Sequence, residues 1–432
     1  MRREKESKNQ NITVEDMNMK PYTDNRFNDD EPFAPDDKQK HGHKNKASGR
    51  MFAVFLTLGI VSLLGGIGCL VAGLLLKPKS GATPNYPDMQ ASKQSSATYS
   101  SLTGEQLADA GLKTAPVYCI QTPNGTDGAR PQSGLKEAGV IFEAIAEAGI
   151  TRFAAIYQNP GSAVIGPIRS LRLYYLEWDT PFDCTIVHAG GADDALEAVR
   201  SGGYKDLSEN YAYMYRGTYG SRLWNNLFTT SAYLKQFSED YGYTTSNIKG
   251  FTRMTPEESQ KSRVDKLAVE KLDIVKPTSA NTSEMTAGVS NIALNYDSTA
   301  SFNVRYSYDE STNTYLRSYE SGAPHEVYEC EATDLGERNP EDVCTLSQMN
   351  PSVVVAMLVQ ESRASDGYHE DIAAIGSGEA YVFQNGTATK GSWSKSSAAE
   401  QIRFYDEAGN EVALAPGQTF VSAIPGYGSV EY

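Results

Sequence analysis

The chain has 432 residues, five cysteines and a formal net charge of −15 at pH 7. The charge is uneven, because residues 1–50 carry 11 basic and 10 acidic side chains, whereas residues 77–432 carry 28 basic and 44 acidic ones. A surplus of negative charge repels polyanions, which argues against nucleic acid as a partner.

The N-terminal region falls into a polar tail and an apolar run. Residues 1–50 are rich in Asn, Asp, Lys and Gln, and such a composition buries too little apolar surface to fold. We expect a disordered tail. Residues 51–76 form a run of 26 residues without a charge. A helix of that length is about 39 Å long, more than the ~30 Å hydrocarbon core of a bilayer. We therefore predict a single transmembrane helix over residues 51–76.

The flanks of this run predict its orientation. Basic residues are denser before it, at positions 38, 40, 44, 46 and 50, than after it. This bias predicts a cytoplasmic N-terminus and an extracytoplasmic C-terminal part in the cell membrane. Two other interpretations stay open. One is a signal peptide cleaved near Ser80-Gly81-Ala82, and the other is lipidation of Cys69, which follows small residues. Residues 77–101 are rich in Ser, Pro, Ala and Gln, which is typical of a flexible linker.

Residues 102–276 alternate between short apolar runs and helical periodicity, which predicts an α/β domain. Strands are expected at residues 117–121, 153–157 and 184–188. Helices are expected at residues 135–148, 169–177 and 192–200, with Gly149 as the stop of the first. A connector rich in Thr and Ser is expected at residues 277–287.

Residues 288–432 predict a second, mostly β domain, either a small sheet or a partly open barrel. Their apolar and tyrosine-rich runs alternate with polar residues, and Asn385-Gly386 is a strong hairpin signal. Strands are expected at residues 292–296, 302–308, 314–319, 353–359, 380–383, 389–393, 402–405 and 412–414.

The cysteines suggest one local disulfide. Cys330 and Cys344 bracket a polar, acidic segment, and we expect them to pair in an oxidising exterior. Cys119 and Cys184 lie in apolar runs and are either buried thiols or a second pair. The chain has no Cys/His spacing typical of zinc, and we expect neither a metal site nor a cofactor.

The densest group of polar candidates lies in the predicted α/β domain. The turn at residues 130–134 presents Arg130, Gln132 and Ser133 beside the free N–H groups of the expected helix start. Glu143 and Glu147 are four residues apart on one face of that helix, and Arg152 follows it. These side chains form the first half of a candidate ligand site.

The second half comes from three later segments. Arg169 and Arg172 are three residues apart on one face of an expected helix. His188, Gly190 and Gly191 follow an expected strand, the usual place of sites in open α/β sheets. Arginine suits carboxylate and phosphate because its planar fork bonds both oxygens. The pattern therefore favours an anion pocket, although structural ion pairs and a hydrogen-bonded scaffold histidine also account for it.

Four of these segments carry a resemblance to a known family. Residues 129–135 (ARPQSGL), 143–153, 165–172 (IGPIRSLR) and 188–191 (HAGG) resemble the YerB-like family of bacterial envelope proteins, many of them lipoproteins. Residues 376–380 (GSGEA), 391–393 (GSW), 404–406 (FYD) and 416–419 (PGQT) resemble its separate C-terminal domain. The family often has a Pro-His-Asn element where this chain has Trp224-Asn225-Asn226, so only Asn226 is carried over. The resemblance implies a two-domain envelope protein without an assigned activity.

Three functions follow as hypotheses. The first is a membrane-anchored extracytoplasmic protein that binds an anionic envelope ligand or a partner protein. The second is an envelope enzyme acting on a phosphate- or carboxylate-bearing glycopolymer precursor, although no nucleophile elbow, phosphate loop or dinucleotide fingerprint is present. The third is a purely structural assembly factor. The tyrosines at 211, 213, 215 and 219 are typical either of a carbohydrate- or protein-binding surface or of ordinary packing.

Overall fold

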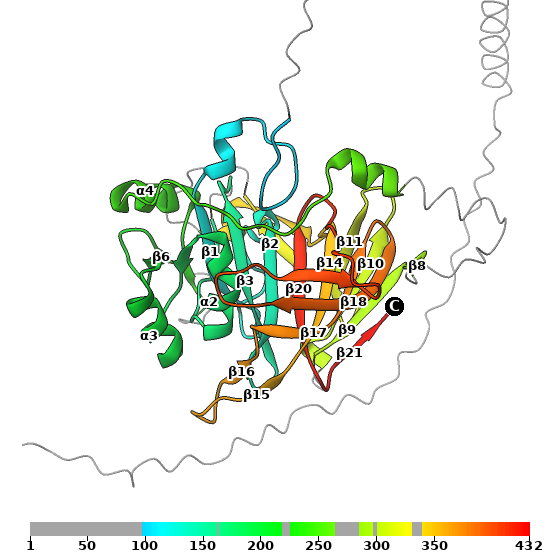
Figure 1. Ribbon diagram of the computed structural model, residues 1–432. Helices are drawn as coiled ribbons and strands as arrows, with labels where there is room; N and C mark the ends of the chain where they lie inside the picture. Colours follow the sequence, from blue (N-terminus) through cyan, green and yellow to red (C-terminus); the bar gives the residue numbers. More distant parts are fainter. Residues whose placement is uncertain (1–96, 162–163, 218–224, 264–284, 297–299, 331–338) are drawn as a thin grey trace, which may run out of the picture. The chain divides into compact units, whose positions relative to one another are not determined.

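The computed structural model describes residues 97–161, 164–217, 225–263, 285–296, 300–330 and 339–432 (Figure 1). The expected tail, the predicted span at residues 51–76 and most of the expected linker lie outside the described residues. Within the described part of the chain, no helix is both long and apolar enough to cross a membrane.

A mixed β-sheet forms the centre of the described molecule. Its strands are β1 (Val117–Pro123), β2 (Val140–Glu147), β3 (Ile150–Gln158), β4 (Thr185–Val187), β5 (Lys205–Leu207), β8 (Met285–Ala287), β14 (Val353–Val359), β17 (Gly376–Gln384), β18 (Thr387–Lys395), β19 (Arg403–Asp406) and β20 (Thr419–Pro425). Their order is β19-β18-β17-β14-β20-β2-β3-β1-β4-β5, and β8 pairs with β18.

The N-terminal part is α/β and the C-terminal region is mostly β, as predicted. The two are joined inside the sheet, because β20 pairs in parallel with β14 on one side and with β2 on the other. Strands from the C-terminal region thus extend the sheet of the α/β part instead of closing into a barrel.

Helices cover the sheet around the N-terminal strands, and in Figure 1 α3 and α4 lie on the left, away from the C-terminal strands. The helical segments are η2 (Ala110–Thr114), η3 (Leu135–Glu137), α2 (Leu173–Asp179), η4 (Thr180–Phe182), α3 (Asp193–Gly202), α4 (Ser231–Tyr241), η5 (Ala300–Phe302) and α6 (Pro340–Val343), with a further helical stretch at residues 256–263. Cys119 on one face of β1 belongs to the core that contains Trp178 of α2, and Ile120 on the other face packs in the core of Leu234 from α4.

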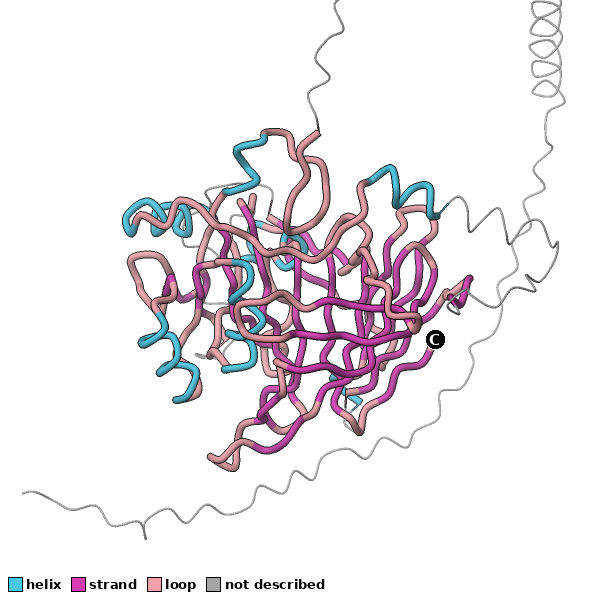
Figure 2. Tube along the Cα trace, viewed as in Figure 1, coloured by secondary structure: helices cyan, strands magenta, loops and turns pink. Residues whose placement is uncertain are grey.

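A second layer covers the C-terminal half. It is a four-stranded sheet made by β9 (Asn291–Asn295), β10 (Val304–Asp309), β11 (Thr314–Tyr319) and β21 (Ser429–Glu431), in the order β11-β10-β9-β21. Tyr306 and Tyr315 of this layer share a core with Phe383 and Ile424 of the central sheet. Figure 2 shows the strands gathered at the centre and the helices at the periphery.

Three two-stranded sheets complete the fold: β6 (Tyr215–Arg216) with β7 (Leu227–Phe228), β12 (Glu326–Glu329) with β13 (Thr345–Gln348), and β15 (Glu361–Arg363) with β16 (Glu370–Ile372).

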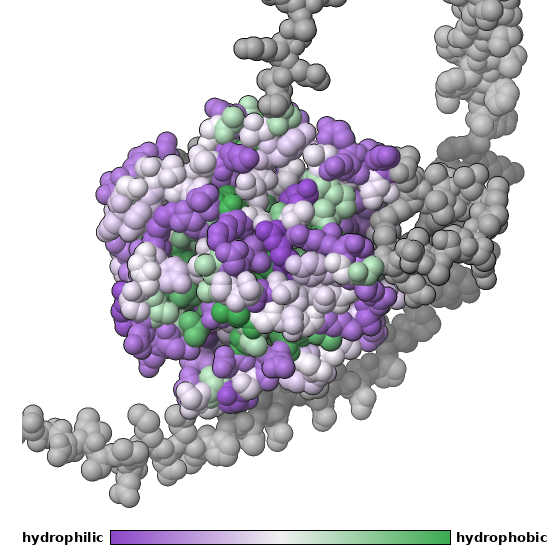
Figure 3. Space-filling view, in the orientation of Figure 1, coloured by the Kyte–Doolittle hydropathy of each residue, from purple (hydrophilic) through white to green (hydrophobic). Residues whose placement is uncertain are grey.

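The outer surface seen in Figure 3 is mostly hydrophilic, with separate apolar patches near its middle.

The prediction of a helix at residues 135–148 is wrong. Only η3 is helical there, and the rest is β2, in which every residue is buried. A strand covered on both faces has no polar side, so its apolar pattern does not distinguish it from a buried helix. Gly149 does not stop a helix but, with Ala148, forms the two-residue turn between β2 and β3, and both residues have positive φ.

Two disulfides lie in the described chain. Cys330 pairs with Cys344, and Cys119 pairs with Cys184 between β1 and the residue before β4.

Candidate functional site

Most of the predicted site residues gather along one edge of the central sheet. β1, β4 and β5 are parallel, and β2 runs in the same direction because both β1 and β2 are antiparallel to β3. The carboxyl ends of β1, β2 and β4 and the start of β3 therefore lie at this edge. The candidate side chains are nevertheless divided among separate clusters.

Glu143 of β2 lies in a fully buried ion pair with Arg317 of β11. The guanidinium Nη2 is 2.8 Å from Oε2, and both side chains are 0% exposed. Thr151 donates to Glu143 at 2.9 Å, and the Asn124 amide donates to Thr151 at 2.8 Å. Burial acts to lower the pKa of Arg317, but the negative charge of Glu143 raises it above its ordinary value. Glu143 thus anchors the second layer to the central sheet.

Gln132 joins this cluster through a histidine that sequence reasoning missed. The His325 Nδ1 accepts a hydrogen bond from Arg317, and its Nε2 donates to the side-chain oxygen Oε1 of Gln132 at 3.0 Å. The Gln132 amide donates in turn to the Pro123 carbonyl at 3.1 Å. Burial, Arg317 and Arg130 lower the pKa of His325 well below its ordinary value, so the ring is neutral.

The missed residues carry a weak sequence signal. Arg317 alternates with Tyr315 and Tyr319 in β11, so a charged residue occupies the apolar face of a predicted strand. His325 carries no such signal.

Arg130 and Ser133 are held in place by neighbouring groups. The Arg130 guanidinium lies 4.0 Å from the centre of the Tyr319 ring, and its Nε donates to the side-chain oxygen Oδ1 of Asn124 at 2.9 Å. The Ser133 hydroxyl donates to the Val164 carbonyl at 2.9 Å, and its N–H donates to Gly166. The prediction of free N–H groups at this turn is therefore wrong for Ser133 and for Gly134, which donates to Tyr328.

Glu147 forms a second cluster on the other face of the sheet. One extra residue between Ile145 and Glu147 makes a β-bulge, which reverses the side to which Glu147 points. Glu147 there pairs with Arg152 and, at 2.9 Å, with Arg172. The prediction that Glu143 and Glu147 share one helical face is wrong, because they lie on a bulged strand and bind different arginines.

Arg169 differs from the other arginines. It lies in extended chain, and α2 begins only after Arg172, so the two do not share a helical face as predicted. The half-buried Arg169 side chain makes no hydrogen bond or close ion pair with any described residue, and its Nε is buried without a partner. Burial and the nearby charge of Arg152 lower its pKa, although Asp127 and Glu147 act to raise it.

His188 lies just after β4, where it was predicted, but both ring nitrogens are engaged. Nδ1 is 2.7 Å from the Gly190 carbonyl oxygen and Nε2 is 2.9 Å from a carboxylate oxygen of Asp206 in β5. Gly190 has a φ of 69°, and a side chain on Gly191 would meet the Leu171 carbonyl. His188 therefore has no ring nitrogen free to act as a base, and its segment supports Asp206.

Asn226 lies directly before β7 and bonds to residues at the end of β6. Its amide donates to the Gly217 carbonyl at 2.9 Å, and its carbonyl oxygen accepts from Arg216 at 3.0 Å. Both groups are used within the fold.

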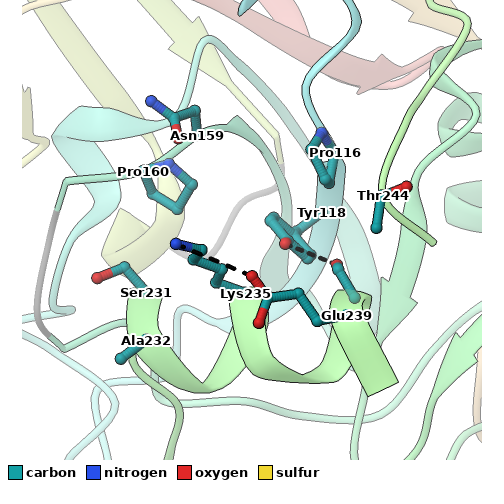
Figure 4. A pocket seen from close by; sticks show the side chains of 10 residues that line it. Pro116, Tyr118, Asn159, Pro160, Ser231, Ala232, Lys235, Glu239 and Thr244 are labelled. Atoms are coloured by element: carbon teal, nitrogen blue, oxygen red, sulfur yellow. Dashed lines mark hydrogen bonds and ion pairs between the residues drawn. The ribbon is translucent and has the colours of Figure 1, made fainter. Parts of the chain in front are cut away.

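Two cavities lie near α4. The first, of about 500 Å³, is bounded by Pro116, Tyr118, Asn159, Pro160 and the side of α4 that carries Lys235 and Glu239 (Figure 4). Its polar groups are largely satisfied internally, because Tyr118 bonds to Ser238 at 2.8 Å and Lys235 faces Glu239 at 3.9 Å. The second, of about 550 Å³, lies between residues 206–212 and the C-terminal half of α4. The described residues contain no group of three His, Cys, Asp or Glu side chains placed to hold a metal ion.

Comparison with known proteins agrees with this architecture. Residues 102–244 match the family model described as the N-terminal domain of “Protein of unknown function (DUF3048)”, and residues 292–421 match the corresponding C-terminal domain. The protein named “Putative lipoprotein YerB” from Bacillus subtilis is 27% identical over 327 residues, covering 73% of this chain and 85% of that protein. The crystal structure of YerB from the same organism has a TM-score of 0.59 at 21% identity, covering 78% of this chain and all of that one, which shows a shared fold.

Proposed function

We propose that this chain, which belongs to the family described as “Protein of unknown function (DUF3048)”, is a membrane-anchored extracytoplasmic protein that binds an anionic ligand of the cell envelope. The observation that carries this proposal is the unpaired guanidinium of Arg169. An unpaired arginine that is partly removed from water is costly, so it is a natural place for an anion.

The surroundings of Arg169 favour a negatively charged ligand. Arg152 and Arg172 lie close enough to act on its charge, and both bind the same carboxylate, that of Glu147. Asp127 adds one further negative charge. Three guanidinium groups against two carboxylates leave one positive charge uncompensated. A carboxylate or phosphate would supply that charge and would accept both N–H groups of the Arg169 fork.

The membrane anchor rests on the sequence. The uncharged run at residues 51–76 is long enough to span a bilayer, and the basic flank supports a location of the described domains outside the cytoplasm. The name of the Bacillus subtilis relative, which describes a lipoprotein, supports attachment to a membrane on the outer side. Whether the run or a lipid on Cys69 supplies the anchor does not alter the proposed binding.

Calorimetric titration tests the binding. The full chain in a nonionic detergent is titrated with pyrophosphate and with citrate at constant ionic strength, because screening alone weakens surface attraction. We expect saturable binding that Arg169→Gln weakens about tenfold or more, since a charge-assisted hydrogen bond contributes roughly 1.5–3 kcal/mol. Arg169→Lys should restore part of the affinity, because it keeps the charge and loses the fork.

Two control variants separate binding from folding. Arg200→Gln removes an exposed arginine in the last turn of α3 and should change neither affinity nor stability. Arg172→Gln breaks a buried ion pair and should lower the free energy of unfolding by about 3–5 kcal/mol, whereas Arg169→Gln should change it by less than about 0.5 kcal/mol. If neither anion binds, or if Arg169→Gln destabilises the protein as strongly as Arg172→Gln, the purely structural interpretation holds instead.

A further inference from the structure

The cavity between residues 206–212 and α4, beside the carboxyl end of β5, is a second candidate binding site. It is open to solvent and is lined by residues 206–212 together with Phe237 and Tyr241 of α4. We propose that this cavity binds a pyranose ring of a neutral saccharide, with Tyr241 as the stacking surface and Asp206 as a hydrogen-bond acceptor.

Tyr241 presents a rigid aromatic surface. Its ring stacks on Phe237, with centroids 4.5 Å apart, and on Tyr243 at 6.1 Å, yet the residue stays 53% exposed. The ring is thus fixed before any ligand arrives, and little side-chain entropy is lost on binding. An exposed aromatic face held in this way suits the C–H face of a sugar ring, which is flat and apolar while its edge carries hydroxyl groups.

Asp206 supplies the polar side of the cavity. Its Oδ1 is held at 2.9 Å by Nε2 of His188, a side chain that is itself 1% exposed. The Asp206 side chain stays 34% exposed, and Oδ2 has no hydrogen-bond partner among the described residues. A carboxylate oxygen in a fixed position accepts hydrogen bonds from sugar hydroxyls. His188 is therefore a positioning residue, because it holds the carboxylate of Asp206 in place without touching the ligand itself.

The charge balance of the cavity favours a neutral ligand over a cation. Both acidic side chains on its wall have a cationic or hydrogen-bonding partner within the protein: Glu209 pairs with Arg216 at 2.6 Å, and Asp206 is bonded to His188. The hydroxyl of Tyr211, which is 61% exposed, also donates to Glu209. The Glu209 charge is thus balanced by Arg216, and Asp206 is left as the single carboxylate of the lining without an arginine or lysine partner, so the net negative charge of the wall is small.

This site does not depend on the proposed anion site. Arg169 is not among the residues that line this cavity, and the link between the two regions is a backbone hydrogen bond from the N–H of Ala189 to the Arg169 carbonyl at 3.0 Å. A variant of one site should therefore leave the other intact, and a glycopolymer that carries anionic groups would be able to use both.

Titration with neutral oligosaccharides tests the proposal. The full chain in a sugar-free detergent is titrated with cellotetraose and with the tetramer of N-acetylglucosamine. We expect binding that Tyr241→Ala weakens about tenfold, while Tyr241→Phe, which keeps the ring, binds like the wild type. Asp206→Asn should also weaken binding, because the amide loses one acceptor oxygen. Tyr368→Ala removes another exposed tyrosine, 61% against 53% for Tyr241, far from this cavity's lining, and should have no effect.

A further variant keeps the test valid if Tyr241→Ala fails to fold. Tyr241→Trp retains a large flat ring and places a fluorophore at the site. Its emission must change on addition of the saccharide, whereas the emission of the three tryptophans of the wild type must not. The proposal is overturned if neither tetrasaccharide binds and the Tyr241→Trp emission stays constant. It is equally overturned if trilysine, a cationic probe, binds in a Tyr241-dependent manner and the saccharides do not. Arg169→Gln should leave saccharide binding unchanged, so failure of the anion proposal is recognised separately.

Discussion

Several of the buried charged side chains in the described structure form ion pairs. Glu143 and Arg317 are 174 residues apart in sequence and both are 0% exposed. Breaking such a pair is strongly destabilising, since the remaining charge is left without a partner in a medium of low polarity. Arg169 differs from these paired arginines, because no carboxylate of the described residues lies within ion-pair distance of its guanidinium and its buried Nε has no hydrogen-bond partner. The contrast identifies Arg169, and not the more deeply buried arginines, as the residue to test for function.

The neutral His325 beside Arg317 predicts a pH-dependent stability. Burial and the charge of Arg317 lower its pKa in the folded state well below the unfolded value of about 6.5. Below that pH the unfolded chain binds a proton that the folded protein does not. The free energy of unfolding should therefore fall as the pH is lowered, by up to about 1.4 kcal/mol per pH unit.

Urea unfolding of the wild type and of His325→Gln between about pH 7.5 and 5.5 measures this effect. Glutamine accepts from Arg317 and donates to Gln132 without titrating, so the variant should lose less stability at low pH than the wild type. The other histidines are the same in both proteins, so their contribution cancels in the difference. Equal slopes for the two proteins would contradict a buried, neutral His325.

At the scale of single elements, turn chemistry and one bulge decide where the site residues point. Ala148 and Gly149 form a two-residue turn that joins β2 tightly to β3, and the bulge before Glu147 turns that carboxylate toward Arg152. Without the bulge, Glu147 would point to the same side as Glu143. The separation into two clusters is thus a property of one hairpin.

The Cys119–Cys184 disulfide joins elements across a sequence separation of 65 residues, and the Cys330–Cys344 disulfide spans 14. In the chain-entropy model a longer loop gives more stabilisation, roughly 4 kcal/mol for the first and 3 kcal/mol for the second. We expect Cys119→Ala/Cys184→Ala to destabilise the protein more than Cys330→Ala/Cys344→Ala. Thermal unfolding of both double variants under oxidising conditions gives the comparison, and the opposite order would show that loop length does not control the effect.

On the scale of the whole molecule, the N- and C-terminal regions share one sheet. Phe420 of β20 lies at their meeting point, with its ring 5.7 Å from Phe153 of β3 and 6.3 Å from Tyr306 of the second layer. The Arg317 guanidinium also lies 4.9 Å from this ring. The two regions that match separate family models are therefore physically continuous in the described structure.

Continuity of the sheet predicts cooperative unfolding. Phe420→Ala should lower stability by about 3–5 kcal/mol and should do so equally for both regions. Variants that retain only Trp178, in α2, or only Trp393, in β18, report on the two regions by fluorescence during urea unfolding. Because the two reporter variants differ in stability, the quantity to compare is the shift of each midpoint on Phe420→Ala, and this shift should be the same for both reporters. A shift confined to Trp393 would show that the regions unfold independently.

Much of the fold is predictable from local sequence. The strands at β1 and β4 and the helix at α3 follow from apolar runs and helical periodicity, and Asn385-Gly386, with φ of 55° and 71°, forms the turn between β17 and β18. Such signals are local, because turn conformation and one-sided burial depend on a few neighbouring residues. β2 was missed since burial on both faces removes the periodicity that identifies a strand.

The sequence by itself determined the uncharged run at residues 51–76, the α/β and β-rich character of the two regions, and the arginine-rich segments that carry the candidate site. Only the tertiary structure decided what those arginines do. Arg152 and Arg172 are occupied by Glu147, Arg130 is held against Tyr319, and Arg169 remains unpaired. The physical reason is that a charge acts on whatever group lies within a few ångströms, and those neighbours come from strands far apart in the chain.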